Sequence, residues 1–304
     1  MPKDAMKLHP LFLVLPVIQA CAPPPAPEGL DDSMRYILRE FYESDAVVSS
    51  GLSGLMTWFD QEGFALLNES ADLDNVGAFS LSGLDDDDVS ALELDDGRDL
   101  SMAAGIVSIA EMGCSWKETE ALYVREDQMA VFEGNYTNYT REYESSLDNF
   151  LDATSTDSFP AVTKDIDPDD VLGDLSGAML YTKNRVTTET IGITIEAPMN
   201  IHFRHGEFDI NGEQRAASIV MGYATEKAIS ADGDNALVQS YSLVINIETQ
   251  DNKTLRLFTI WNELDFLFES DAPIVLMTAV NQSQDAAVRL SSICTGDITL
   301  AENG

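Results

Sequence analysis

Hydrophobic residues recur at every second position through much of the stretch 179–261, and no other feature constrains the fold of this chain as strongly. Successive side chains of a β-strand point to opposite faces of a sheet, so the pattern predicts strands with one buried face. Asn211-Gly212 lies between two such runs and predicts a tight hairpin turn. Polar turns at 232–235 and 250–253 complete the prediction of an antiparallel meander. The alternating positions are Ile191, Ile193, Ile195, Ile201, Phe203, Phe208, Ile210, Ile219, Met221, Tyr223, Leu237, Tyr241, Leu243, Ile245, Ile247, Leu255, Leu257 and Trp261.

An apolar sheet face has to be covered, and helical patterns in the first half of the chain supply the expected cover. A helix is predicted to begin near Asp31-Asp32-Ser33, where such side chains can satisfy free backbone N–H groups. A second, weaker helix is predicted over 52–59, ending before Gly63. The apolar positions of these helices, three or four residues apart, are Met34, Ile37, Leu38, Phe41, Leu52, Leu55, Met56 and Phe59.

More helix is predicted between 102 and 150. An apolar stripe over 102–112 has helical spacing and is followed by Gly113, which is suited to end a helix. Ser115 and Glu118 form the pattern of a capping box, in which each side chain bonds the backbone N–H of the other residue. Aromatic and apolar residues over 129–150 predict one long helix. Gly134 and the threonines that follow it favour the alternative, a pair of strands.

Together these patterns predict an α+β fold, in which a helical N-terminal half packs on an antiparallel β-meander in the C-terminal half. Residues 31–170 are expected to form the mainly helical part, including an acidic loop at 71–99. Residues 171–304 are expected to form the β part, with a short helix or strand around Val288, Leu290 and Ile293 near its end.

The first twenty residues have the layout of a secretory signal peptide. Lys3 and Lys7 precede an apolar run over 11–18, and the small residue Ala20 stands directly before Cys21. The run is far shorter than the ~20 apolar residues that span a bilayer. No later stretch of the sequence is long and apolar enough to cross a membrane.

The segment Ile18-Gln19-Ala20-Cys21 resembles the lipobox of bacterial lipoproteins, although Gln19 is an unusual residue at its position. The resemblance covers only about the first tenth of the chain. It implies that residues 1–20 are removed, that Cys21 carries fatty chains such as palmitate, and that the proline-rich residues 21–30 tether the folded part to an outer membrane. Plain secretion without the anchor is the alternative.

Two cysteines remain after Cys21. In an oxidising compartment, an even pair of cysteines often forms a disulfide, so we predict a bond between Cys114 and Cys294. The alternative is a pair of free buried thiols.

The chain is strongly acidic, with 53 acidic and 17 basic residues and a formal net charge of −36. Such a charge repels nucleic acids and anionic lipid head groups, so binding to either is excluded as an expected function. A solvated acidic coat suited to a saline habitat is the favoured interpretation. A specific cationic partner, or loose association with divalent cations, is the alternative.

No motif predicts a catalytic residue, a metal ligand or a cofactor. His202 and His205 are three residues apart on a predicted strand, so they should point to opposite faces. The segment 72–77 has three of the positions of an EF-hand loop, but Val76 replaces an oxygen ligand and Gly83 stands where the bidentate Glu should be. Acidic residues are too abundant for any pair to be singled out.

These observations favour a non-enzymatic lipoprotein of the cell envelope that binds a partner protein or an apolar small ligand. Two other functions stay open at this level. One is an extracellular hydrolase that uses carboxylates, and the other is a structural or adhesive surface protein assisted by divalent cations.

Overall fold

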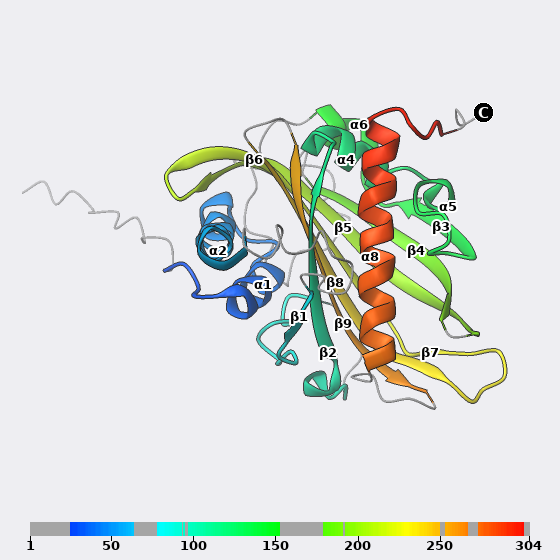
Figure 1. Ribbon diagram of the computed structural model, residues 1–304. Helices are drawn as coiled ribbons and strands as arrows, with labels where there is room; N and C mark the ends of the chain where they lie inside the picture. The colour runs from blue at the N-terminus through cyan, green and yellow to red at the C-terminus, as the bar shows by residue number, and fades with distance from the viewer. Residues whose placement is uncertain are drawn as a thin grey trace, which may run out of the picture.

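The computed structural model describes residues 25–63, 78–92, 94, 97–152, 179–190, 192–249, 253–266 and 273–300. It has three layers, in which helices cover both faces of one antiparallel sheet (Figure 1). The predicted signal peptide, Cys21, the segment 72–77 and the predicted boundary near residue 170 lie outside the described residues. The strands are β1 (Ala78–Leu81), β2 (Ala104–Met112), β3 (Asn138–Tyr143), β4 (Met179–Thr190), β5 (Ile193–Ile210), β6 (Glu213–Ala224), β7 (Ala228–Ile229), β8 (Ala236–Glu248) and β9 (Thr254–Asp265).

The helices lie on opposite sides of this sheet. α1 (Leu30–Arg39) and α2 (Asp45–Trp58) cover one face, and the long helix α8 (Pro273–Cys294) lies across the other (Figure 1). Shorter helical segments are η1 (Phe59–Gly63), η2 (Leu100–Met102), α4 (Trp116–Tyr123), α5 (Gln128–Val131) and α6 (Leu147–Asp152). The sheet order is β1-β2-β9-β8-β6-β5-β4-β3, with β7 beside β8.

The predicted meander is confirmed. Neighbours in the chain pair as antiparallel strands from β3 to β6, and β6 then pairs with β8 and β8 with β9. Asn211 and Gly212 form the tight turn between β5 and β6, with φ angles of 55° and 84°. Positive φ at both central residues is what a type I′ hairpin turn requires. The hairpin therefore has the register that this dipeptide favours.

The face of the sheet toward α1 and α2 carries the larger hydrophobic core. Alternate residues of β6, β8 and β9 point to it. The two helices contribute Met34, Ile37, Leu52 and Leu55, and the turn between them contributes Phe41, all buried. This confirms the prediction that N-terminal helices cover an apolar sheet face. α1 begins at Leu30 and carries acidic residues in its first turn, and α2 gives way to η1 before Gly63.

The opposite face, which we call the α8 face, holds a second core. It contains Leu180, Phe203, Val220 and Val244 from the strands, and Leu290 from α8. The predicted fold class is therefore right in its coarse form, α+β with an antiparallel sheet. The finer prediction, with all helices in the N-terminal half and a short segment at the end, is wrong because α8 is C-terminal and 22 residues long.

Two predicted helices are wrong. Residues 104–112 form β2, which pairs with β1 and β9 and is buried at Ile106, Val107 and Ile109. A strand buried on both faces loses its alternation, and its apolar positions then match a helical spacing by chance. The long helix predicted over 129–150 is replaced by α5, β3 and α6, and Gly134 has a φ of 91° between α5 and β3. The capping box at Ser115 and Glu118 is present as predicted.

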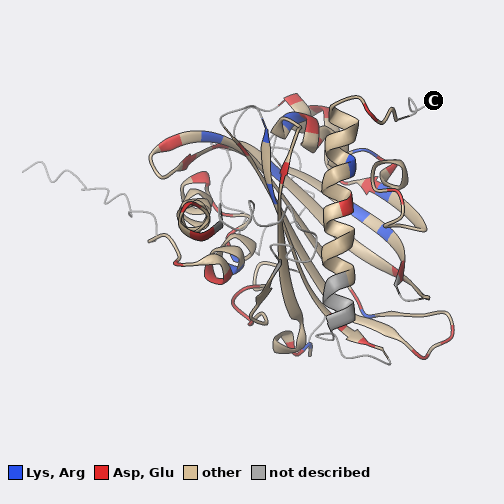
Figure 2. Ribbon diagram, viewed as in Figure 1, with Lys and Arg blue, Asp and Glu red and all other residues tan. Residues whose placement is uncertain are grey.

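The acidic loop predicted at 71–99 is more ordered in its described part than a solvated loop would be. Residues 78–81 form the edge strand β1. Arg35 of α1 pairs with Asp85 and Asp88, and the side chain of Asp88 is 1% exposed. Elsewhere, acidic residues are spread over loops and helix surfaces (Figure 2). None of the helices in the described ranges meets the length and hydropathy needed to cross a membrane.

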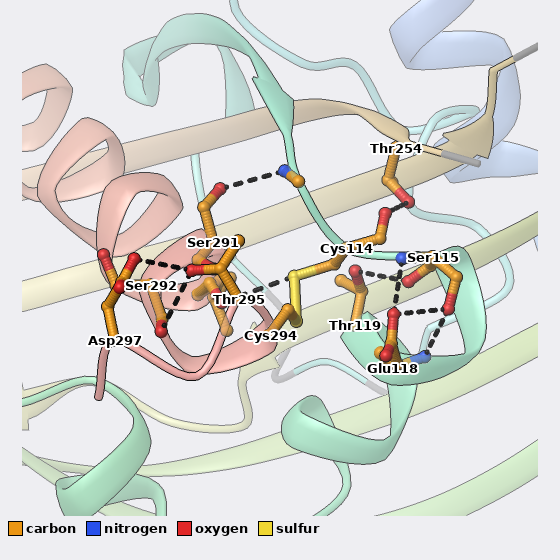
Figure 3. The surroundings of a disulfide bond; sticks show 12 residues. Cys114, Ser115, Glu118, Thr119, Thr254, Ser291, Ser292, Cys294, Thr295 and Asp297 are labelled. Carbon is orange, nitrogen blue, oxygen red and sulfur yellow. Dashed lines mark hydrogen bonds between the residues drawn. A yellow bond between two sulfur atoms is a disulfide. The ribbon is translucent and has the colours of Figure 1, made fainter. Parts of the chain in front are cut away.

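The predicted disulfide between Cys114 and Cys294 is present (Figure 3). Cys114 follows β2, and Cys294 is the last residue of α8. Thr254 at the start of β9 donates a hydrogen bond of 2.8 Å from its hydroxyl to the Cys114 carbonyl. The Gly113 N–H donates to the Ser291 hydroxyl at 3.2 Å. The C-terminal end of α8 is thereby fastened covalently to the sheet.

Candidate functional site

A cavity of about 280 Å³ lies between α8 and the α8 face of the sheet. Strands β3 to β6, β8 and β9 form its floor, and α8 forms its roof. The residues that line it from the strands and α8 include Arg141, Val186, Ile193, Ile195, Ala197, Met199, Ile201, Phe203, Val220, Ser240, Ser242, Val244, Arg256, Phe258, Ile260, Asn262, Thr278, Ala279, Gln282, Ser283 and Ala286.

Strand and helix periodicity place these side chains. On β9, Arg256, Phe258 and Ile260 alternate with residues of the other core and so point toward α8. On α8 the lining residues lie three or four positions apart, which places them on one face of the helix. Ala279 and Ala286 on that face are small, and a roof of small side chains leaves room above the sheet.

The wall of the cavity is mainly apolar. The apolar side chains that line it include Ile195, Ile201 and Phe203 of β5, Val244 of β8 and Phe258 of β9. Cavities that bind small molecules in proteins are usually lined in this way, with a few placed polar groups. Such polar groups are present and come from β8, β9 and α8 and from the segment that includes α4, α5 and β3.

Arg256 is one of the deeply buried polar groups of the cavity, with 3% of the residue exposed. Its Nε donates to the Tyr123 hydroxyl at 2.8 Å, and its Nη1 donates to the Ser283 hydroxyl at 2.9 Å. The guanidinium carbon lies 5.1 Å from the centre of the Phe258 ring, within cation–π range. Arg256 thus joins the sheet to α4 and α8.

Arg141 of β3 supplies a second guanidinium to the cavity. Its Nη1 donates to the backbone carbonyls of Tyr123 and Arg125, and its Nη2 donates to the Tyr139 hydroxyl at 2.6 Å. The Tyr139 hydroxyl in turn donates to the Asn184 side chain at 2.7 Å. These bonds hold Arg141 in one orientation.

Tyr136 completes the polar end of the cavity. Its ring packs against Phe132 and Tyr139. Burial raises the pKa of Tyr136, and the positive charges of Arg141 and Arg256 oppose that rise. Burial likewise raises the pKa of Tyr139 to about 12, against the opposing charge of Arg141. Both hydroxyls therefore stay protonated at neutral pH and can donate hydrogen bonds.

The two histidines lie in separate clusters, as their spacing predicts. His202 faces α1 and α2 among Tyr42, Tyr181 and Tyr223, and its Nδ1 lies 2.5 Å from the Tyr42 hydroxyl. Desolvation by burial lowers the pKa of His202 to about 3. His202 is therefore neutral over the physiological pH range.

His205 lies on the α8 face, where its Nδ1 is 2.7 Å from a carboxylate oxygen of Glu120. Burial raises the pKa of Glu120, and the neighbouring His205 opposes that rise. Trp116 and Phe150 pack against the imidazole ring. Within the described ranges, no three side chains of the types His, Cys, Asp or Glu are grouped so that they could hold a metal ion.

The sequence-predicted residues do not form the cavity. Cys114 and Cys294 lie at one end of α8, and Cys21 is outside the described residues. Sequence reasoning missed Arg256, Arg141 and the tyrosines around them. One signal was present: Arg256 interrupts the apolar run Leu255-Arg256-Leu257-Phe258 inside a predicted buried strand, where a charge needs a partner.

No protein-family model and no curated protein matches the chain. Among solved structures, it is similar to TTHA0849 from Thermus thermophilus, with 10% identity and a TM-score of 0.34 over 64% of this chain and 98% of that one. Ara h 8.0201 gives 9% identity and a TM-score of 0.31, over 63% of this chain and 97% of that one. The lipid transfer and protein localization domain of human StarD13 (DLC2) gives 8% identity and a TM-score of 0.35, over 79% of this chain and 98% of that one.

Proposed function

We propose that this protein is a non-enzymatic binding module that holds an apolar small molecule between α8 and the sheet, and that it is exported as a lipoprotein anchored through Cys21. The observation that supports binding is the cavity itself. Its volume of about 280 Å³ is near the lower end of the range of ligand sites, and its wall is mainly apolar. A ligand there would replace water against side chains such as Ile201, Val244 and Phe258.

Binding is tested by fluorescence titration with N-phenyl-1-naphthylamine, a neutral probe that emits strongly in apolar surroundings. We expect saturable binding with one probe per chain. Ala279, a small residue of the cavity roof, is the position to fill. The substitution Ala279→Phe should weaken binding by about tenfold or more, because the ring occupies the volume that the probe needs.

Val288 supplies the matched control on the same helix. Its side chain is 67% exposed, so Val288→Phe adds the same ring to α8 outside the cavity and should leave probe binding unchanged. Thermal unfolding of both variants establishes that they are folded. Equal binding by the wild type and Ala279→Phe, or absence of saturable binding to the wild type, would contradict the proposal.

Export and anchoring rest on the sequence of the first residues. The disulfide between Cys114 and Cys294 supports an oxidising compartment. Metabolic labelling with a clickable palmitate analogue should mark the wild-type protein and leave Cys21→Ser dark, because that cysteine is the proposed attachment point. Labelling that persists in Cys21→Ser, or a wild type that stays dark although abundant and intact, would rule out the anchor. Two fatty chains make such an anchor durable, since each methylene buried in the bilayer contributes about 0.8 kcal/mol to the free energy of membrane binding.

A further inference from the structure

Arg256 carries a positive charge into the cavity and leaves part of its hydrogen-bonding capacity unused. A guanidinium has five N–H donors, and only Nε and Nη1 bond to described residues. Nη2 makes no hydrogen bond within the described part of the chain. Because only 3% of the Arg256 residue is exposed, bulk water cannot solvate the guanidinium charge freely.

The hydrogen-bond partners of Arg256 among the described residues are all neutral, namely a tyrosine hydroxyl, a serine hydroxyl and a backbone carbonyl. Arg141, the other arginine that lines the cavity, likewise bonds only neutral groups in the described ranges. This is unusual in a chain with 53 acidic residues. Arginines that do pair with a described carboxylate are Arg35, Arg39, Arg125, Arg185, Arg204, Arg215 and Arg289.

Tyr136 lines the same cavity and adds a hydroxyl donor to it. Its hydroxyl makes no hydrogen bond to a described residue, and its ring is held by Phe132 and Tyr139. Tyr136, Arg141 and Arg256 all line the cavity. Three donors therefore meet at one end, two of them positively charged, without an acidic side chain of the described chain to balance them.

We propose that the ligand is a single-chain amphiphile with an anionic head group, a carboxylate in the first instance, bound by Arg256, Arg141 and Tyr136. This rests on the function proposed above and names the chemical class of its ligand. The head group would accept hydrogen bonds from the Arg256 Nη2 and from the Tyr136 hydroxyl. The chain would lie along Phe258 and Ile260 of β9 and along Val244 of β8.

Charge and volume both favour this class. A hydrogen bond between two ionised groups is roughly twice as strong as one between neutral groups, and a buried guanidinium gains most from an anion. A methylene takes about the room of a water molecule, ~30 Å³, so 280 Å³ corresponds to about nine such groups. This fits one chain of medium length. The net charge of −36 repels anions at long range, so selection for an acid has to come from these local donors.

The test is displacement of N-phenyl-1-naphthylamine from the full-length protein by three ligands of equal chain length: decanoate, decanol and decyltrimethylammonium. We expect decanoate to displace the probe at a concentration about tenfold or more below that of decanol. The cationic ligand should be the weakest of the three. Decyl phosphate, run alongside, distinguishes a carboxylate preference from a general preference for anions.

Two variants connect the preference to the proposed donors. Arg256→Gln should bring decanoate to the level of decanol, with each displacement measured against the variant's own affinity for the probe. Tyr136→Phe removes one hydroxyl that has no described partner, so it should keep the fold and reduce the preference by about threefold. Arg98→Gln is the matched control. Arg98 also lacks a described carboxylate partner, but it donates to the Ala224 and Thr225 carbonyls away from the cavity.

The outcomes separate the two proposals. Saturable probe binding with equal displacement by decanoate and decanol would overturn the anionic ligand and leave the binding module in place. A preference for decanoate that is unchanged in both Arg256→Gln and Tyr136→Phe would also overturn it, and would show that Arg256 only joins α8 to the sheet. Absence of probe binding to the wild type would overturn the proposed function and this inference with it.

Discussion

Removing the disulfide between Cys114 and Cys294 is expected to lower the free energy of unfolding by about 5 kcal/mol. The bond closes a loop of 180 residues, and the loss of loop-closure entropy from the unfolded chain predicts this magnitude. The double substitution Cys114→Ala/Cys294→Ala tests it by urea unfolding with linear extrapolation. The same change frees the end of α8, which is the roof of the cavity, so probe binding should weaken as well.

Reduction provides the control for the disulfide experiment. A reducing agent should shift the unfolding midpoint of the wild type toward that of the double variant and leave the double variant unchanged. A difference of less than about 1 kcal/mol between wild type and double variant would contradict the stabilising role of the bond. Loss of stability without loss of probe binding would show that the disulfide is not needed to hold α8 over the cavity.

Acidification is expected to remove up to about 5 kcal/mol of stability through His202 alone. The pKa of His202 is about 3 in the folded protein because burial disfavours the charged imidazole, whereas an exposed histidine has a pKa of about 6.5. The unfolded chain therefore binds a proton that the folded chain does not. The contribution is fully present above about pH 6.5 and is lost as the pH falls toward 3.

His202→Phe isolates this effect among the many carboxylates of the chain. Between about pH 6.5 and pH 5, the free energy of unfolding should fall by about 2 kcal/mol more in the wild type than in the variant. This follows from a slope of about 1.36 kcal/mol per pH unit for one proton. A phenylalanine suits a site formed by Tyr42, Tyr181 and Tyr223. Tyr42→Phe is the control, and it should keep the wild-type slope because burial, rather than the Tyr42 hydroxyl, lowers the pKa of His202. Equal slopes for wild type and His202→Phe would contradict a buried, neutral histidine.

The sequence predicted the parts of the fold that local rules determine. The hairpin at Asn211-Gly212 follows from the backbone angles that this dipeptide adopts, and the capping box at Ser115 follows from its own side-chain bonds. The meander follows from alternation on β6, β8 and β9. The pairing of Cys114 with Cys294 followed from counting cysteines once Cys21 was assigned to lipid.

The parts that were missed depend on long-range packing. β2 lies inside the sheet between β1 and β9, so its buried residues lack an exposed face to reveal the period of two. β5 buries Ile201 and Phe203 on the α8 face but Phe208 and Ile210 on the other. The apolar positions of β5 therefore change from one face of the sheet to the other where one core ends and the next begins. For this reason the sequence pattern does not indicate that both faces of the sheet are covered.

The cavity could not be predicted because its residues are far apart in the chain. Arg141, Arg256 and Ala279 lie on β3, β9 and α8, and only the sheet order and the path of α8 bring them to one space. The length of α8 was also missed, since only its last apolar residues show a clear helical pattern. An arginine inside a buried strand is the one local sign of the site, and it becomes informative only when its partners are known.

Photolabelling with a ten-carbon alkyl diazirine, mapped by peptide mass spectrometry, tests most directly whether the space under α8 is a ligand site. We predict that label is concentrated on β9 and on the part of α8 around Ala279 and Ser283, and that excess decanol removes it. Label spread equally over α1 and α2, or label that decanol does not displace, would contradict the account.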